Sequence, residues 1–188
     1  MLFRSVEDVD PYSPRIVDTE LDELTAQLPA ISIEGPKGVG KTVTAARRAS
    51  TVHDLDEPAS LNFASGDPAR LLLSSPPVLI DEWQHIPSVW NLVRRAVDAG
   101  AGAGTFLLTG SASPPSVGLH SGAGRIVTVR MRPLTLPERG FATPTVSLGQ
   151  LLTGQRPTLT GASAAGLEDY VNEILRSGLP GIRLPGGP

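Results

Sequence analysis

The residues that point most directly to chemistry form one short stretch, Gly35-Pro36-Lys37-Gly38-Val39-Gly40-Lys41-Thr42. This stretch matches the phosphate-binding pattern G-x-x-x-x-G-K-[ST] at every fixed position. Glycines let such a loop take backbone angles that side chains forbid, so its N–H groups can surround a phosphate. In this pattern Lys41 lies between the β- and γ-phosphates, and the Thr42 hydroxyl binds Mg²⁺. The stretch therefore predicts a binding site for a nucleotide phosphate.

The flanking sequence fits that prediction. Residues 30–33 form a short β-branched run typical of a buried strand, and residues 43–49 predict a small-residue helix. A loop between a strand and a helix N-terminus favours an anion, because the helix dipole is positive there. We therefore include Val43 among the nucleotide-binding residues. A chance match is the alternative in a chain with 20 glycines, and the strand–loop–helix context argues against it.

A second apolar run, Val78-Leu79-Ile80, leads directly into Asp81 and Glu82. An apolar strand that delivers a carboxylate toward Mg²⁺ is the usual second half of a nucleotide triphosphatase site. Asp81 is the predicted metal ligand beside Thr42. Glu82 is the predicted general base that polarises an attacking water. The alternative is a pair of solvated carboxylates at a strand end.

Two further groups carry less specific signals. Thr109 and Ser111 follow the apolar run at 105–108 and could contact the γ-phosphate or orient the water, or could serve turn chemistry beside Gly110. Arg125 could supply positive charge to the transition state, from its own chain or from a neighbouring copy. An ordinary arginine at a strand edge is the alternative for Arg125.

The order of the predicted elements indicates an α/β fold. Strands at 30–33, 51–55, 78–80, 105–108 and 125–129 alternate with helices at 43–49, 68–73 and 88–99, after a first helix at 19–28. Such alternation predicts a three-layer α-β-α sandwich around a mainly parallel sheet. Ligands of such sheets bind at the carboxyl ends of strands. The phosphate loop, Asp81 and Thr109 each follow a strand, so we expect them at one edge.

Composition narrows the class of protein. The 188 residues contain 40% hydrophobic and 19% charged residues, which is close to globular averages, and no cysteine. The net charge of −3 does not indicate a nucleic-acid partner. No apolar run is long enough to span a membrane, and the N-terminus lacks the apolar core of a signal peptide, so we expect a cytoplasmic protein. The scattered histidines His53, His85 and His120 suggest no metal site.

Taken together, the motifs resemble one family, the prokaryotic AAA-like P-loop ATPases in which the ATPase domain precedes a C-terminal domain of unknown function. The resemblance is carried by the phosphate loop, by Val78-Leu79-Ile80-Asp81-Glu82-Trp83-Gln84, by Phe106-Leu107-Leu108-Thr109-Gly110-Ser111, by Gly124-Arg125 and by Arg132-Pro133-Leu134-Thr135-Leu136-Pro137-Glu138. It implies Mg²⁺-ATP binding and slow or regulated hydrolysis. It also places Thr109–Ser111 at the first-sensor position, where many AAA proteins carry asparagine.

These observations predict an N-terminal lead-in at 1–28, a P-loop ATPase domain at 29–140, and a linker with a helix at 167–175 in 141–188. The last segment either docks on the sheet domain or begins a C-terminal domain of a longer chain. A homo-oligomer or an unknown protein partner is compatible with the family. Two other functions stay open: a non-catalytic nucleotide switch, and a P-loop small-molecule kinase. A GTPase is disfavoured because no N-K-x-D motif occurs.

Overall fold

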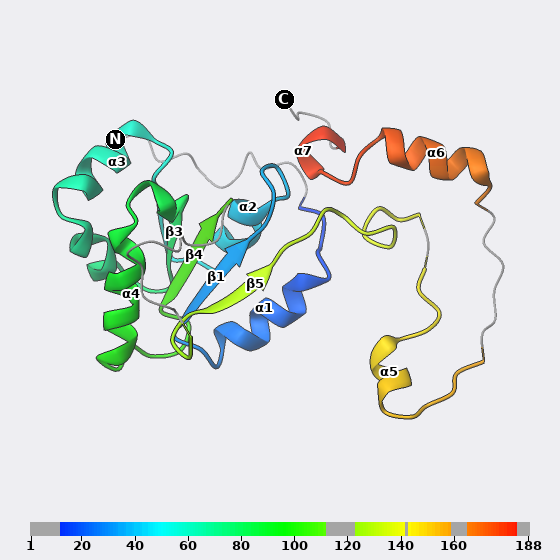
Figure 1. Cartoon of the computed structure of the whole chain (residues 1–188), viewed down its shortest axis with the longest axis horizontal. Coiled ribbons are helices and arrows are strands. Elements are labelled where there is room, and N and C mark those ends of the chain that lie inside the picture. Colours follow the sequence, from blue (N-terminus) through cyan, green and yellow to red (C-terminus); the bar gives the residue numbers. More distant parts are fainter. Residues whose placement is uncertain (1–11, 112–122, 142, 159–164, 184–188) are drawn as a thin grey trace. The chain divides into compact units, whose positions relative to one another are not determined.

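The computed structural model describes residues 12–111, 123–141, 143–158 and 165–183, shown in Figure 1. They divide into two compact units. The first, here called the sheet unit, is Ile16–Arg132. The second unit consists of the described residues of Met1–Arg15 and Pro133–Pro188. The domain boundaries predicted from the sequence, at 28/29 and 140/141, stay predictions.

The sheet unit is built on five parallel strands in the order β2-β3-β4-β1-β5. The strands are β1 (Ala30–Glu34), β2 (Thr51–Asp54), β3 (Val78–Asp81), β4 (Phe106–Gly110) and β5 (Val127–Arg130). The three central strands are buried along their whole length, whereas the edge strands β2 and β5 are partly exposed. Parallel strands buried on both faces read as continuous apolar runs, which is why these strands were predictable.

Helices flank the strands of the sheet unit. They are α1 (Val17–Thr25), α2 (Lys41–Ala46), α3 (Pro58–Gly66), the 3-10 helices η2 (Pro68–Leu73) and η3 (Trp83–His85), and α4 (Ser88–Asp98). The helices predicted at 19–28, 43–49, 68–73 and 88–99 are confirmed with small shifts of their ends. Helix α3 was not predicted, because its sequence shows little amphipathic periodicity and places Phe63 at the surface.

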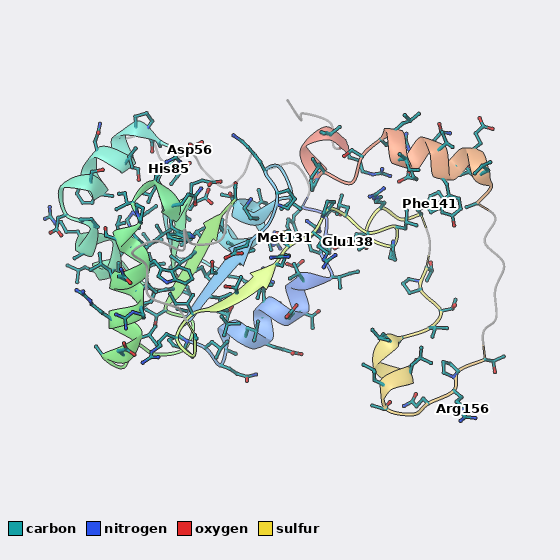
Figure 2. The ribbon with its side chains drawn as sticks, in the orientation of Figure 1. Asp56, His85, Met131, Glu138, Phe141 and Arg156 are labelled. Carbon is teal, nitrogen blue, oxygen red and sulfur yellow. The ribbon has the colours of Figure 1, made fainter. Side chains whose placement is uncertain are left out.

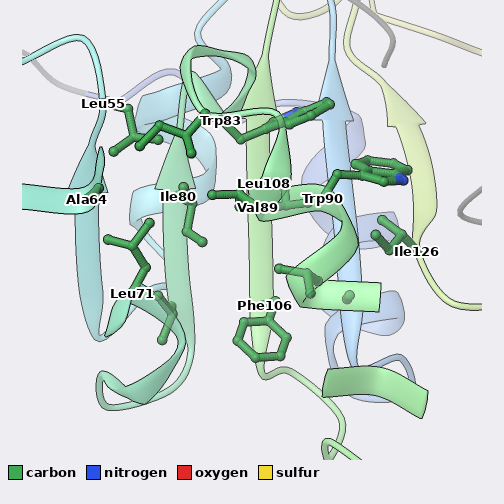
Figure 3. Close-up of a cluster of buried hydrophobic side chains, with 14 residues drawn as sticks. Leu55, Ala64, Leu71, Ile80, Trp83, Val89, Trp90, Phe106, Leu108 and Ile126 are labelled. Atoms are coloured by element: carbon green, nitrogen blue, oxygen red, sulfur yellow. The ribbon is translucent and has the colours of Figure 1, made fainter. Parts of the chain in front are cut away.

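One face of the sheet carries the larger core cluster, drawn in Figure 3. Ile80 of β3 and Leu108 of β4 meet the side chains of α3, η2 and α4 there. Trp83 and Trp90 lie in this cluster with their ring centroids 5.0 Å apart, as expected for packing aromatics. The alternate strand residues, such as Leu79 and Leu107, are equally buried and face the side contacted by α1 and α2. Helices on both faces confirm the predicted α/β sandwich.

The second unit has a different construction. It contains α5 (Leu148–Leu152), α6 (Leu167–Leu175) and α7 (Pro180–Arg183), and α6 has the predicted bounds. Leu134 is its one buried hydrophobic residue among those described. Polar contacts hold it instead: Arg15 Nε donates to Glu138 over 3.0 Å, and Glu173 pairs with Arg183. Figure 2 labels Glu138 among the side chains. No described helix in either unit has the length and apolarity needed to cross a bilayer.

The central strand β4 should dominate the stability of the sheet unit. Replacing the fully buried Leu108 by alanine removes apolar contacts and leaves a cavity, which costs about 2–5 kcal/mol. Urea unfolding followed by circular dichroism measures this free energy. The control is Leu73→Ala, because Leu73 is 84% exposed and its truncation should change the free energy of unfolding very little. Equal losses in the two variants would contradict the described core.

Candidate functional site

The parallel sheet brings its strand ends to one edge. In register, the strands reach this edge at Asp54, Asp81, Gly110, Glu34 and Arg130. Strand β4 lies between β1, which leads into the phosphate loop, and β3, which carries the acidic pair. The loop and the acidic pair therefore lie on opposite sides of the end of β4. The predicted gathering of the three motifs at one edge agrees with this topology.

The phosphate loop connects β1 to α2. Its tip, Pro36–Gly38, is exposed, whereas Val39 is fully buried beneath it. Gly35 passes so close to the strand extension at Met131 that a Cβ on Gly35 would collide with the Met131 carbonyl oxygen. The backbone N–H of Met131 also donates to Glu34 O over 2.7 Å. The first glycine of the motif is thus required by a backbone contact, in addition to any contact with a ligand.

Lys41 turns back over the loop. Its Nζ donates to the carbonyl oxygens of Gly35, over 2.9 Å, and Pro36, over 3.1 Å. The residue is only 5% exposed, and this burial lowers the pKa of Lys41, while the carboxylates of Glu82 and Asp81 act in the opposite direction. A cationic donor is therefore held at the mouth of the loop, where a phosphate oxygen could replace the carbonyl oxygens as its acceptor.

Asp81 is the centre of a second set of contacts. The hydroxyl of Thr42, at the start of α2, lies 3.0 and 2.9 Å from its two carboxylate oxygens. The hydroxyl of Thr109, at the end of β4, donates to Asp81 Oδ1. Burial raises the pKa of Asp81, and the two hydroxyl donors partly offset this by stabilising the charged form. Three elements therefore converge on one buried carboxylate.

The oxygen atoms gathered here fit a magnesium ion. Mg²⁺ prefers hard oxygen ligands and in nucleotide sites uses one or two side chains together with phosphates and water. The Thr42 hydroxyl and the Asp81 carboxylate are such ligands, already adjacent and half-buried or buried. The described residues contain no cluster of three or more histidine, aspartate or glutamate side chains able to hold a metal.

Glu82 follows β3 with an unusual backbone. Its φ of 49° lies in the left-handed region, which non-glycine residues rarely adopt. One carboxylate oxygen, Oε2, accepts a hydrogen bond from Gln84 Nε2, and the other lies 3.5 Å from Ser111 Oγ. The charge of this side chain acts to raise the pKa of Lys41, against the effect of burial.

Arg125 is the predicted site residue that the structure does not bring to this group. It precedes β5, which begins at Val127 and runs parallel to β1, so it lies toward the amino ends of the strands. Its Nε donates to Asp98 at the end of α4 over 2.8 Å. Within a single chain, Arg125 is therefore remote from the phosphate loop. At the loop's own edge, β5 ends with Arg130 beside Glu34.

The other predicted residues differ in how far they are buried and in what they contact. Thr109 is buried and bonded within the site rather than used for turn chemistry, whereas Ser111 is exposed. Val43 is 43% exposed on the first turn of α2. The His53 ring accepts or donates a 2.8 Å hydrogen bond with Ser74, and burial lowers its pKa.

His85 lies 3.5 Å from the exposed carboxylate of Asp56, and both are labelled in Figure 2. Neither residue joins the group around Asp81 in any described hydrogen bond. His120 lies outside the described residues. Sequence reasoning missed the contact of Gln84 with Glu82. Its signal was the run Asp-Glu-Trp-Gln, in which the glutamine comes two residues after the proposed base.

Comparison with known proteins gives two consistent findings. Residues 27–139, more than half of the chain, match the model of a family described as an AAA domain. Two relatives, uncharacterized proteins of Mycobacterium bovis and Mycobacterium tuberculosis, are each 30% identical to this chain over 169 residues. These matches cover 84% of this chain and 38% of each relative, so the chain spans about two fifths of their length.

The contact of Gly35 with the Met131 backbone generates a prediction. Gly35→Ala should lower the free energy of unfolding by about 1–3 kcal/mol beyond the cost of its positive φ, because a backbone carbonyl cannot move aside easily. Gly100→Ala is the matched control, since Gly100 also has a positive φ but no atom lies within 4 Å of its added Cβ. Equal destabilisation in urea unfolding would show that the close approach is unimportant.

Proposed function

The chain belongs to the AAA-domain family, and we propose that it binds ATP with Mg²⁺ and hydrolyses the γ-phosphate. The observation that carries this proposal is the cluster around Asp81. It joins a phosphate-loop hydroxyl, a strand-end carboxylate and the hydroxyl of Thr109 in one hydrogen-bonded group. Lys41 lies beside it, and the charges of Glu82 and Asp81 act to raise the Lys41 pKa that burial lowers. A structural cluster alone would not require a lysine held among loop carbonyls.

Binding is the first part of the proposed function. The N–H groups of residues 37–43 would surround the β-phosphate, and the start of α2 adds its positive dipole. Lys41 would exchange its two carbonyl acceptors for β- and γ-phosphate oxygens. This exchange keeps the ammonium group hydrogen-bonded before and after binding, so its partial burial costs little.

Magnesium is the proposed cofactor. When bound, it would supply Lewis-acid charge to the β- and γ-phosphate oxygens. Thr42 and Asp81 would hold it, and the hydrogen bond that now joins them would be given up for shared contact with the cation. Thr109 would continue to donate to Asp81 and so fix the orientation of the carboxylate, a supporting role that metal-binding carboxylates commonly need.

Hydrolysis is the second part. Glu82 would accept a proton from the attacking water as the water oxygen bonds to the γ-phosphorus and the bond from that phosphorus to the β–γ bridging oxygen breaks, releasing ADP and phosphate. Lys41 would stabilise the charge that develops on the phosphate oxygens. Arg125, remote from the loop in its own chain, could contribute only from a neighbouring copy, and the hydrolysis proposed here does not depend on it.

The test replaces the proposed base without changing its shape. Glu82→Gln should lower kcat for ATP hydrolysis by about 10²–10⁴-fold and leave Mg²⁺-ATP binding intact, because an amide cannot take the proton. Phosphate release and equilibrium nucleotide binding measure the two effects separately. Glu57→Gln is the control, since Glu57 is an exposed carboxylate beyond the end of β2.

Two outcomes would change the proposal. Unchanged turnover in the Glu82 variant would exclude Glu82 as the base. A wild-type chain that binds Mg²⁺-ATP without turnover would instead support a nucleotide-dependent switch.

A further inference from the structure

The proposed base is held by a neighbour that the phosphate-binding motifs do not include. We infer that Gln84 is a positioning residue that orients the carboxylate of Glu82 toward the attacking water. This inference rests on the proposed hydrolysis. It concerns Gln84, which the proposed hydrolysis does not include, and its measurable effect is a lower kcat in a Gln84 variant.

The backbone at Glu82 creates the need for such a residue. A left-handed conformation is unfavourable for a residue with a side chain and persists only where its surroundings fix it. Here Glu82 opens the 3-10 turn η3, and its carbonyl oxygen accepts the His85 N–H over 3.0 Å. The next residue, Trp83, is fully buried and packs against Trp90. The turn is thus anchored in the core by Trp83, and the half-buried Glu82 side chain beside it has contacts of its own.

Gln84 provides one of these contacts from the same turn. Its Nε2 donates to Glu82 Oε2, a hydrogen bond to a charged acceptor, which is stronger than one between neutral groups. The contact to the other carboxylate oxygen, from the exposed Ser111 hydroxyl to Glu82 Oε1, is long at 3.5 Å. Gln84 is therefore the main described group that fixes the rotation of the carboxylate.

The oxygen atom of the Gln84 amide lies in an unfavourable environment when the nitrogen contacts Glu82. Gln84 Oε1 is buried and has no hydrogen-bond partner among the described residues, and the same holds for the nearby Trp83 Nε1. Buried polar atoms normally find partners, so an unpaired one calls for a compensating contact. The charged hydrogen bond to Glu82 is the contact available to this side chain.

Strand β4 leaves room for the glutamine at Gly110. A Cβ at that position would lie 2.5 Å from Gln84 Oε1 and 3.1 Å from Trp83 Nε1. Gly110 ends the strand between the phosphate loop and the acidic pair, so a side chain there would push Gln84 from its place. The position of the Gln84 amide therefore depends on the lack of a side chain at Gly110.

The held carboxylate lies at the edge of the sheet that carries the phosphate loop. Glu82 directly follows Asp81, whose Oδ1 lies 3.0 Å from the hydroxyl of Thr42 at the end of that loop. Glu82 Oε1 lies 3.5 Å from Ser111 Oγ beyond the end of β4. A general base must lie within hydrogen-bond reach of its proton, and a misplacement of about 1 Å can cost on the order of 10²-fold in rate. Loss of the Gln84 contact should therefore affect turnover far more than binding.

The experiment uses Gln84→Met, which keeps the length of the side chain and removes its N–H donor. We expect kcat to fall by about 10²-fold while the Kd for a non-hydrolysable Mg²⁺-ATP analogue stays at the wild-type value. Gln27→Met is the matched control, because Gln27 is exposed before β1 at the opposite edge of the sheet. It should keep wild-type kcat and Kd.

A double-mutant cycle separates positioning from damage to the fold. In a Glu82→Gln background, Gln84→Met should have no further effect on the residual turnover, because the carboxylate that Gln84 orients is gone. A further loss there of the same size as in the wild-type background, or a parallel loss of analogue binding, would overturn the inference. So would wild-type kcat in the single Gln84 variant.

The wild-type chain distinguishes this failure from failure of the proposed function. If wild type hydrolyses ATP and Gln84→Met does so equally well, only the role of Gln84 is wrong. If wild type neither binds nor hydrolyses Mg²⁺-ATP, the proposed function fails, and the inference fails with it.

Discussion

A carboxylate that is almost enclosed by protein must find hydrogen-bond donors, and in this chain that requirement falls on Asp81. Its donors come from two other elements, the Thr42 hydroxyl of α2 and the Thr109 hydroxyl of β4. The three elements can meet only because β4 is inserted between β1 and β3 in a parallel sheet. The donors of Asp81, and with them the arrangement of the site, therefore depend on the strand order.

The same carboxylate links stability to the proposed function. Burial raises the pKa of Asp81 in the folded chain. A carboxyl group with a raised folded pKa favours folding most below its unfolded pKa, and this contribution is lost as the pH rises through the folded value. Above its folded pKa, the ionised Asp81 therefore opposes folding. A cation bound beside Thr42 would relieve that penalty, which is the kind of compromise that functional sites commonly show.

Much of this arrangement could be predicted from the sequence, because the central strands are continuous apolar runs. Each run leads directly into a motif of the site: the phosphate loop, the acidic pair Asp81-Glu82, or Thr109. What could not be predicted depends on register and on side-chain direction. Arg125 could act from its own chain or from a neighbouring copy, but β5 begins at Val127 and reaches the loop's edge at Arg130, so within one chain Arg125 lies toward the other end of the strand. The contact of Gln84 with Glu82 depends on a left-handed residue. The second unit has few buried apolar residues, so its sequence carries little periodic signal.

The central claim is that the loop at 35–42 binds a nucleotide phosphate through Lys41. Titration of Mg²⁺-ATP into the wild-type chain and into Lys41→Ala, followed by the fluorescence of Trp83 and Trp90 and checked by calorimetry, tests it most directly. We expect saturable binding to wild type and a large loss of affinity in the variant, because the substitution removes a buried ammonium group that would donate to the phosphates. Equal affinities, or no binding to the wild-type chain, would contradict it.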